Sequence, residues 1–194
     1  MNKAEIQAYF DRHAKSWDEN MIRSQKKIEI ILDAAGVDAE CTVLDVACGT
    51  GVLFEDYLLR GVKKLVGVDI STEMTSIARR KYPQSHVSVI CADIEEADMG
   101  MQFDCCVVYN AIPHFPDPQS LIQKLASMTR PKGRLCIAHG MSREAIMKHH
   151  SKGAKHVSRP LPEAGEMSKM MEQFFAVDTM ISDHEKYIVA GSRI

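Results

Sequence analysis

A glycine-containing turn, followed at a distance by an acidic residue, is the part of this sequence best suited to chemistry. The stretch Val43–Gly51 reads VLDVACGTG, and Asp69 follows Gly51 by 18 positions. Glycines let the backbone of such a turn approach a ligand closely, and the helix after it offers free N–H groups. A carboxylate at the end of the next strand can accept hydrogen bonds from both hydroxyl groups of a ribose. The pattern therefore predicts a nucleoside site.

A nicotinamide or flavin dinucleotide is the competing ligand for this turn. Its fingerprint requires a third glycine, so that helix and strand pack closely and the pyrophosphate reaches the helix end. Phe54 stands at that place, and Asp45 puts an anion before the turn. Both residues disfavour a pyrophosphate and therefore a nicotinamide oxidoreductase. They favour a ligand that has a ribose and a positive charge but no phosphate.

Such strand-end residues need a sheet to position them, and the chain alternates short apolar runs with amphipathic segments. The runs are apolar on both faces, which is typical of strands in a sheet covered on both sides. The predicted strands are Thr42–Val46, Lys64–Val68, His86–Ile90, Phe103–Tyr109 and Arg134–Ala138. The predicted helices are Ile22–Ala35, Val52–Arg60, Thr72–Lys81, Pro118–Thr129 and Arg143–Lys152.

The C-terminal part breaks the alternation. Ala176–Ser182 and Lys186–Ser192 are strand-like runs with a gap too short for a crossover helix, which predicts an antiparallel hairpin. We therefore expect one α/β domain over residues 1–194. It would be a Rossmann-like, doubly wound, mostly parallel seven-stranded sheet, with helices on both faces and a C-terminal antiparallel hairpin.

The composition predicts an ordinary globular protein. Hydrophobic residues make up 45% of the chain, charged residues 26%, and the formal net charge is −2. These values give no signal for a nucleic-acid or membrane partner. The N-terminal residues lack a secretory apolar region, and no apolar run approaches the ~18 residues that span a bilayer. The six cysteines form no CxxC pair, which favours buried thiols in the cytoplasm over disulfides or a zinc site.

Residues 130–159 are locally basic, with eight lysines and arginines against Glu144 alone. This stretch could attract an anionic substrate, although a solvated basic face is the simpler interpretation.

At this point the sequence resembles a known family. Asp45–Gly51, DVACGTG, resembles motif I of the class I S-adenosylmethionine (SAM)-dependent methyltransferases, in the group typified by quinone-methylating and other small-molecule enzymes. The resemblance extends in the same order over roughly residues 40–140. It includes the ribose-binding strand end, the adenine clamp, the fourth strand and the turn into the fifth, at Asp69-Ile70-Ser71, Cys91-Ala92-Asp93-Ile94, Phe103–Asn110 and Arg130–Leu135.

The resemblance implies a SAM site. Its parts would contact the methionine moiety, the ribose, the adenine and the sulfonium, with a lid segment over residues 1–20. The implied cofactor-binding residues are Asp45, Ala47, Gly49, Gly51, Asp69, Ile70, Asp93, Ile94, Asn110 and Trp17. Each has a simpler alternative: Asp69 could cap the helix near Ser71, Asp93 could cap a turn, and Trp17 could anchor a first helix.

His114 is the best-placed candidate for a general base. Methyl transfer from a sulfonium is an in-line displacement, so a base is needed only when the nucleophile must lose a proton. Relatives often carry a histidine pair here, but Pro113 replaces the first, which puts a two-histidine mechanism in doubt. Alternatively, His114 packs over the cofactor without taking part in the chemistry.

Two more histidines could touch the substrate. His139 ends the fifth strand, and His149 shares a predicted helix face with Ile146, so that helix could bring His149 close to His139. Together with His150 they could bind a metal or a metalloid substrate, line a polar substrate pocket, or simply be core residues. Residues 141–165, between strands five and six, occupy the place where relatives carry substrate-covering elements. No metal cofactor is expected.

The function expected from the sequence is SAM-dependent methylation of a small-molecule acceptor, at an oxygen, nitrogen, sulfur or carbon atom. A non-catalytic domain that binds SAM or its demethylated product is the alternative. Asn110-Ala111-Ile112-Pro113 is not the Asn/Asp-Pro-Pro-aromatic run of nucleic-acid base methylases. The protein would be a monomer or a homodimer.

Overall fold

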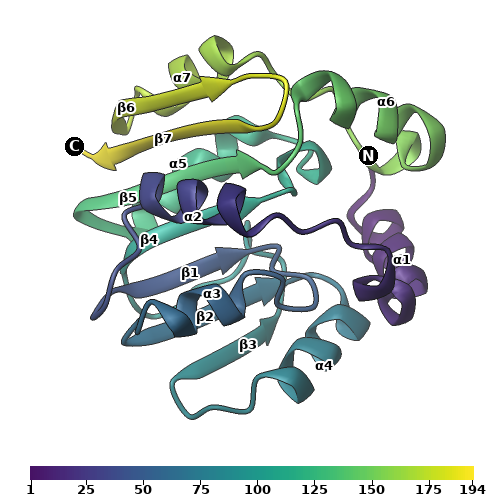
Figure 1. Cartoon of the computed structure of the whole chain (residues 1–194), viewed down its shortest axis with the longest axis horizontal. Helices are drawn as coiled ribbons and strands as arrows, with labels where there is room; N and C mark the ends of the chain where they lie inside the picture. Colours follow the sequence, from purple (N-terminus) through teal and green to yellow (C-terminus); the bar gives the residue numbers. More distant parts are fainter.

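The computed structural model describes the backbone of residues 1–194 and the side chains of all residues except 20, 151 and 152. Its centre is a seven-stranded sheet with the strand order β3-β2-β1-β4-β5-β7-β6 (Figure 1). In chain order the strands are β1 (Thr42–Val46), β2 (Lys64–Asp69), β3 (Val87–Cys91), β4 (Phe103–Tyr109), β5 (Thr129–His139), β6 (Phe175–Ser182) and β7 (Tyr187–Arg193).

The strand pairing confirms the predicted fold class. β1, β2, β3, β4 and β5 pair with one another in parallel. β7 pairs antiparallel with both β5 and β6, so the C-terminal hairpin closes one edge of the sheet. In the described part of the chain, no helix is long and apolar enough to cross a membrane.

Helices cover both faces of the sheet. Apolar side chains of α2 (Gln25–Ala34), α3 (Phe54–Leu59) and α4 (Thr72–Lys81) pack into the core on one face. Those of α5 (Pro118–Met128), α6 (Arg143–Gly153) and α7 (Ala164–Met171) pack on the other. Figure 1 shows α2 and α3 in front of the sheet and α5 behind it, while α1 (Lys3–His13) and α6 lie beyond the strand ends.

The burial of one strand and the starts of two elements differ most from the sequence-based expectation. β3 was expected to be apolar on both faces, but it is an edge strand and its residues are half-buried or exposed. The predicted helix Ile22–Ala35 begins only at Gln25, because Ser24 is extended and Ile22 points into solvent. β5 begins at Thr129 instead of Arg134, because Thr129 pairs with Phe103 across an irregularity in the register.

The sheet changes direction of winding between β1 and β4, where the carboxyl ends of two neighbouring parallel strands separate. Ligands bind at such switch points in open α/β sheets. A non-glycine residue with positive φ follows each strand there, Ala47 at 54° and Asn110 at 54°. A left-handed residue of this kind costs about 1 kcal/mol, although asparagine tolerates it better than most. This strain is concentrated where the sequence predicts the ligand.

Phe54 occupies the position where a dinucleotide-binding turn needs glycine, and Gly67 of the neighbouring strand makes room for its ring. Its ring is fully buried and lies directly over Gly67 in β2. A Cβ atom on Gly67 would overlap the Phe54 ring and come within 2.9 Å of the Cys48 sulfur. The close approach of helix and strand thus depends on a glycine in the strand and an aromatic ring on the helix.

We expect Gly67→Ala to lower the free energy of unfolding by about 1–3 kcal/mol, because the extra methyl group overpacks the core. Urea unfolding followed by circular dichroism measures the change. Gly165→Ala is the matched control, because Gly165 lies in α7 with open space around its Cα. This control should stabilise the protein by about 0.5–1 kcal/mol. An equal effect of both substitutions would contradict the packing account.

Candidate active site

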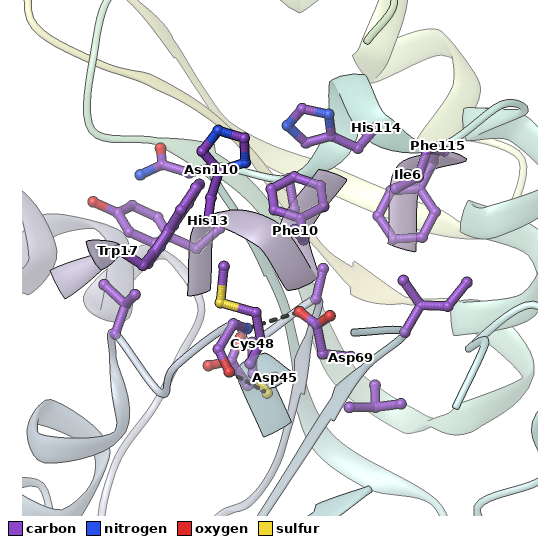
Figure 2. Close-up of a pocket in the computed structure, with 18 of the residues that line it drawn as sticks. Ile6, Phe10, His13, Trp17, Asp45, Cys48, Asp69, Asn110, His114 and Phe115 are labelled. Carbon is purple, nitrogen blue, oxygen red and sulfur yellow. Dashed lines mark hydrogen bonds between the residues drawn. The ribbon is translucent and has the colours of Figure 1, made fainter. Parts of the chain in front are cut away.

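A cavity of about 440 Å³ lies at the carboxyl ends of β1, β2 and β4. Its floor comes from the turns after these strands. Its cover comes from α1, the short helix η1 (Ala14–Ser16), Trp17 and residues 21–23. Figure 2 shows Asp45 and Asp69 on one side of the cavity, with Phe10, His13 and Trp17 facing them from the cover. Ligand pockets of this size bury most of a drug-sized molecule.

Nine of the ten residues expected to bind the cofactor line this one cavity. They are Asp45, Ala47, Gly49, Asp69, Ile70, Asp93, Ile94, Asn110 and Trp17. Gly51 is the exception and lies outside the lining. Its φ is +82°, and a Cβ atom there would come within 2.8 Å of the Tyr82 ring. Gly51 therefore shapes the turn, and its contact with a ligand stays a prediction.

Asp69 ends β2 and is held by two backbone amides. Its carboxylate accepts hydrogen bonds from the N–H groups of Gly49 and Ser71, each at 2.8 Å. Burial nevertheless raises its pKa. The helix-cap alternative applies to Ser71, whose hydroxyl accepts from the N–H of Met74 at 3.1 Å. A carboxylate has about four lone-pair positions, so two remain for a ligand hydroxyl pair.

Asp45 is the residue with the least compensated charge. It is 2% exposed, and the described side chains and amides provide no hydrogen bond to its carboxylate. Burial, with the nearby Asp69 carboxylate, raises its pKa well above the usual value. The two cations that line the same cavity, Lys3 and Arg23, are paired with carboxylates other than Asp45. An electron-rich cavity wall of this kind suits a cationic ligand.

Asp93 is engaged from two sides in the ligand-free structure. Its Oδ1 accepts from the N–H of Glu95 at 3.0 Å, which is the turn-capping role considered from the sequence. Its Oδ2 accepts from Lys3 Nζ at 2.5 Å, and Lys3 also pairs with Glu95 at 3.0 Å. The carboxylate expected to receive an adenine amine is therefore already covered by a lysine of α1.

Two further carboxylates dock the cover onto the body of the protein. Asp11 accepts from the Ser71 hydroxyl at 2.6 Å and from the N–H of Glu73 at 3.1 Å. Asp18 accepts from the Thr50 hydroxyl at 2.5 Å and pairs with Lys81 at 2.8 Å. The sequence reasoning did not identify Lys3, Asp11 or Asp18, because their partners lie far along the chain and no local spacing pairs them.

The cover also brings aromatic rings to the cavity. Trp17 packs edge-on against Phe10 at a ring-centroid separation of 5.6 Å. Phe10 in turn meets His114 edge-on at 4.9 Å. Trp17 therefore both anchors the first helix and lines the cavity, so the two alternatives considered for it coexist.

His114 lies in a short 3₁₀ turn after β4 and lines the cavity (Figure 2). Its Nδ1 is 2.8 Å from the Val157 carbonyl oxygen. A carbonyl only accepts, so Nδ1 carries the proton and Nε2 keeps its lone pair. Burial lowers the pKa of His114, which keeps the ring neutral. This is the state that a general base requires.

The other two histidines are not placed as expected. His139 ends β5 and is 2% exposed, but it does not belong to the cavity lining. Burial, with His114 and His150 nearby, lowers its pKa to about 3. His149 lies at the cavity rim and is exposed, so the expected approach of His149 to His139 is wrong.

His150 takes the inward position instead. It follows the buried Ile146 by four residues, about 40° around the helix, whereas His149 lies about 60° to the other side. The Nδ1 of His150 and the Nε2 of His139 are buried without a hydrogen-bond partner among the described residues. In that part of the chain, no three His, Cys, Asp or Glu side chains are arranged to hold a metal ion.

Three of the eight basic residues in this stretch pair with acids that are distant in the sequence. Arg130 pairs with Asp104, and Arg134 pairs with Asp178. Arg143 pairs with Glu163 at 2.8 Å. The Lys152 side chain lies outside the described residues. These pairs favour a structural role for the basic residues over attraction of an anionic substrate.

We expect Asp45→Asn to raise the free energy of unfolding of the ligand-free protein at neutral pH by about 1–3 kcal/mol, because a buried charge is removed. The pKa of Asp45 is higher in the folded than in the unfolded chain. Its ionisation therefore costs stability as the pH rises through the folded-state pKa, and costs nothing below the unfolded value of about 3.9. The gain should shrink as the pH falls toward 4.

Urea unfolding at a series of pH values measures this effect. Asp98→Asn provides the control, because Asp98 is exposed and its oxygen accepts only from a nearby loop amide at 2.9 Å. A loss of stability in Asp45→Asn at neutral pH would show that the carboxylate is compensated after all.

Known proteins with similar sequences and folds agree with this geometry. The malonyl-[acyl-carrier protein] O-methyltransferase of Acetivibrio thermocellus is 29% identical over 71% of this chain and 50% of its own length. The ubiquinone biosynthesis O-methyltransferase of Xanthomonas axonopodis pv. citri is 30% identical over 64% of this chain and 54% of its own. The chain thus spans about half the length of these relatives.

A solved structure shares the fold over nearly the whole chain. The N-methyltransferase NodS from Bradyrhizobium japonicum WM9, in complex with S-adenosyl-L-homocysteine, matches with a TM-score of 0.75 and 15% identity. The match covers 97% of this chain and 98% of NodS. Residues 44–137, which contain the turns that form the cavity floor, match the family described as Methyltransferase domain. The central segment of this chain thus matches the methyltransferase-domain family, and the fold is that of the class I methyltransferases.

Proposed function

We propose that this protein transfers a methyl group from SAM to a small-molecule acceptor. The single observation that supports this proposal most strongly is the buried Asp45 carboxyl group, which faces the cavity and has no ion-pair partner among the described side chains. SAM is a nucleoside that carries positive charges on a sulfonium and an ammonium group, and it would supply a cation next to Asp45. A dinucleotide would add phosphates next to Asp45 and Asp69, which burial already makes hard to ionise.

The cavity residues divide naturally among the parts of SAM. Asp69 and Ile70 would hold the ribose, and Asp93 with Ile94 would hold the adenine. Ala47 and Gly49 would contact the methionine part, Asp45 would face its positive charge, and Asn110 would lie beside the sulfonium. Trp17 would cover them as part of a lid over residues 1–20. Bound there, SAM supplies an electrophilic methyl carbon.

The Asn110 side chain is held in a fixed position, as a residue beside the sulfonium would need to be. Its Oδ1 accepts a hydrogen bond from the N–H of Gly140 at 3.0 Å, which ties the ends of β4 and β5 together. This contact fixes the side chain while the backbone stays in the left-handed conformation. A rigid polar group at this point helps align the acceptor for in-line attack.

His114 would act as the general base. Its Nε2 lone pair is available because Nδ1 donates to Val157. A base of lowered pKa stays unprotonated at neutral pH and can take the proton that the nucleophile loses. His149 at the rim would meet the acceptor where it enters the cavity. His139 lies deeper and would act only indirectly.

The remaining features support a small acceptor. The names of the similar O-methyltransferases favour an oxygen nucleophile among the four possible atoms. Residues 141–165 form α6 and the 3₁₀ turn η4 (Lys155–Val157) and would cover the acceptor. Six cysteines without disulfide bonds support a cytoplasmic location. The protein would work as a single domain, as a monomer or a homodimer, and without a nucleic-acid partner.

We expect SAM and S-adenosylhomocysteine each to stabilise the protein against unfolding by about 2.7 kcal/mol at 100 times their dissociation constants. NADH at the same concentration should have no effect. Thermal unfolding with the three ligands in parallel measures this. Asp69→Ala should abolish the stabilisation, while Asp98→Ala, at an exposed site, should keep it. Stabilisation by NADH alone would refute the proposal.

We expect His114→Asn to keep the affinity for SAM and to lower methyl transfer by about 10²–10⁴-fold, because the base is lost. A screen of phenols, thiols, amines and metalloid acids, read by the mass of one added methyl group, identifies the acceptor first. Initial rates over pH 6–9 then compare variant and wild type. Equal rates would remove His114 as the base, and binding without any transfer would favour a non-catalytic SAM-binding domain.

A further inference from the structure

Three histidines connect the cavity to the surface. His114 lines the cavity, His150 is half-buried behind it, and His149 is exposed on the next position of α6. The ring centroids of His114 and His150 are 5.2 Å apart, and those of His150 and His149 are 6.0 Å apart. We propose that these rings form a relay that carries the proton released by the acceptor from His114 to solvent. This proposal rests on the proposed methyl transfer.

The reaction produces a proton that must leave a closed site. When a nucleophile X–H attacks, an X–C bond forms and the C–S bond breaks, and its electron pair stays on sulfur. The X–H proton goes to Nε2 of His114, because Nδ1 already holds a proton. His114 then carries a full positive charge in a buried place, where the charged form is disfavoured. The next turnover requires that this proton leave.

His150 is the group placed to receive it. Its ring is tilted by 50° to that of His114, and its Nδ1 is buried with no partner among the described residues. Ring edges at these centroid separations are within reach of a direct hydrogen bond or of one bridging water. A buried imidazole nitrogen without a hydrogen-bond partner is destabilising, so a proton or a water that engages it removes this penalty.

The surroundings of the three histidines favour movement of the proton from His114 toward the solvent. Burial, with His114 and His149 nearby, lowers the pKa of His150 to about 4, so His150 holds a proton only in passing. His139 lies on the inner side, and burial keeps its ring neutral as well. His149 is the first imidazole of the series that is open to water, and a charge there is solvated. Histidine is the side chain best suited to such shuttling near neutral pH.

The alternative exit runs through the cover. His13 is exposed and also lines the cavity, and its Nδ1 lies 2.7 Å from the Tyr9 carbonyl oxygen. No ring contact joins His13 to His114 among the described aromatic pairs, whereas His150 is in such contact. The test therefore has to compare these two routes.

The experiment measures proton exchange on His114 without SAM or acceptor. Protein labelled with ¹⁵N-histidine is studied near the pKa of His114 by NMR relaxation dispersion, which reports the rate of protonation and deprotonation of the ring. We expect His150→Asn to slow this exchange several-fold and His149→Asn to slow it less. Added free imidazole should restore the rate in His150→Ala. His86→Asn, at an exposed site before β3, should leave it unchanged.

Stabilisation by SAM shows that each variant is folded. An unchanged exchange rate in His150→Asn overturns the relay, and so does a His13→Asn variant that slows exchange more than His150→Asn does. Circular dichroism and urea unfolding provide a second check that each variant is folded, so these outcomes do not depend on SAM binding or on methyl transfer. A working relay in a protein that methylates nothing would refute the activity and leave the proton path standing.

Discussion

The structure depends on one unfavourable interaction, the burial of the Asp45 carboxylate at the end of a central strand. A charged group in this position is difficult to ionise, and its neighbour Asp69 makes ionisation harder still. Folded proteins retain such groups where a ligand supplies the missing charge. The cations that line the cavity do not neutralise Asp45, because Lys3 pairs with Asp93 and Arg23 pairs with Asp56. The protein thus holds a buried carboxyl group whose ionised form a cationic ligand would stabilise.

The sheet makes this arrangement possible. Asp45 pairs in register with Gly67 on one side and Val107 on the other, so strong backbone pairing holds it from both sides. The chain then leaves the sheet through left-handed residues at Ala47 and Asn110, and the turns separate around the cavity. The N-terminal cover adds carboxylate contacts from Asp11 and Asp18. These contacts join the cover to Ser71 and Thr50, whose side chains are buried.

Much of this was predictable from the sequence, because the decisive signals are local. Runs that are apolar on both faces mark the strands, and residues that follow parallel strands must meet at one edge of the sheet. The positions of Asp45 and Asp69 follow from that rule, whereas those of Asp93 and Asn110 were implied by the family resemblance. The short gap before Lys186 likewise predicted the antiparallel hairpin, which the pairing of β6 and β7 confirms.

Contacts that depend on exact rotation or on distant partners were not predictable. Whether His149 or His150 faces inward depends on a difference of about 100° around α6, and both share a face with Ile146 in a sequence pattern. The pairing of Lys3 with Asp93 joins residues that are 90 positions apart. Gly51 was expected at the ligand because a turn glycine can serve either the ligand or the turn itself. Only the packing of Tyr82 against it shows its role in the turn.

The central claim is that Asp45 makes the cavity specific for a cationic nucleoside, and isothermal titration calorimetry tests it most directly. SAM is titrated into the wild type and into Asp45→Asn, in two buffers of different ionisation enthalpy. We predict that SAM binding releases more protons from the wild type than from the variant, since a cation favours the ionised carboxylate. The wild type should also bind more tightly as the pH rises. Equal affinity and equal proton release in the two proteins would contradict the account.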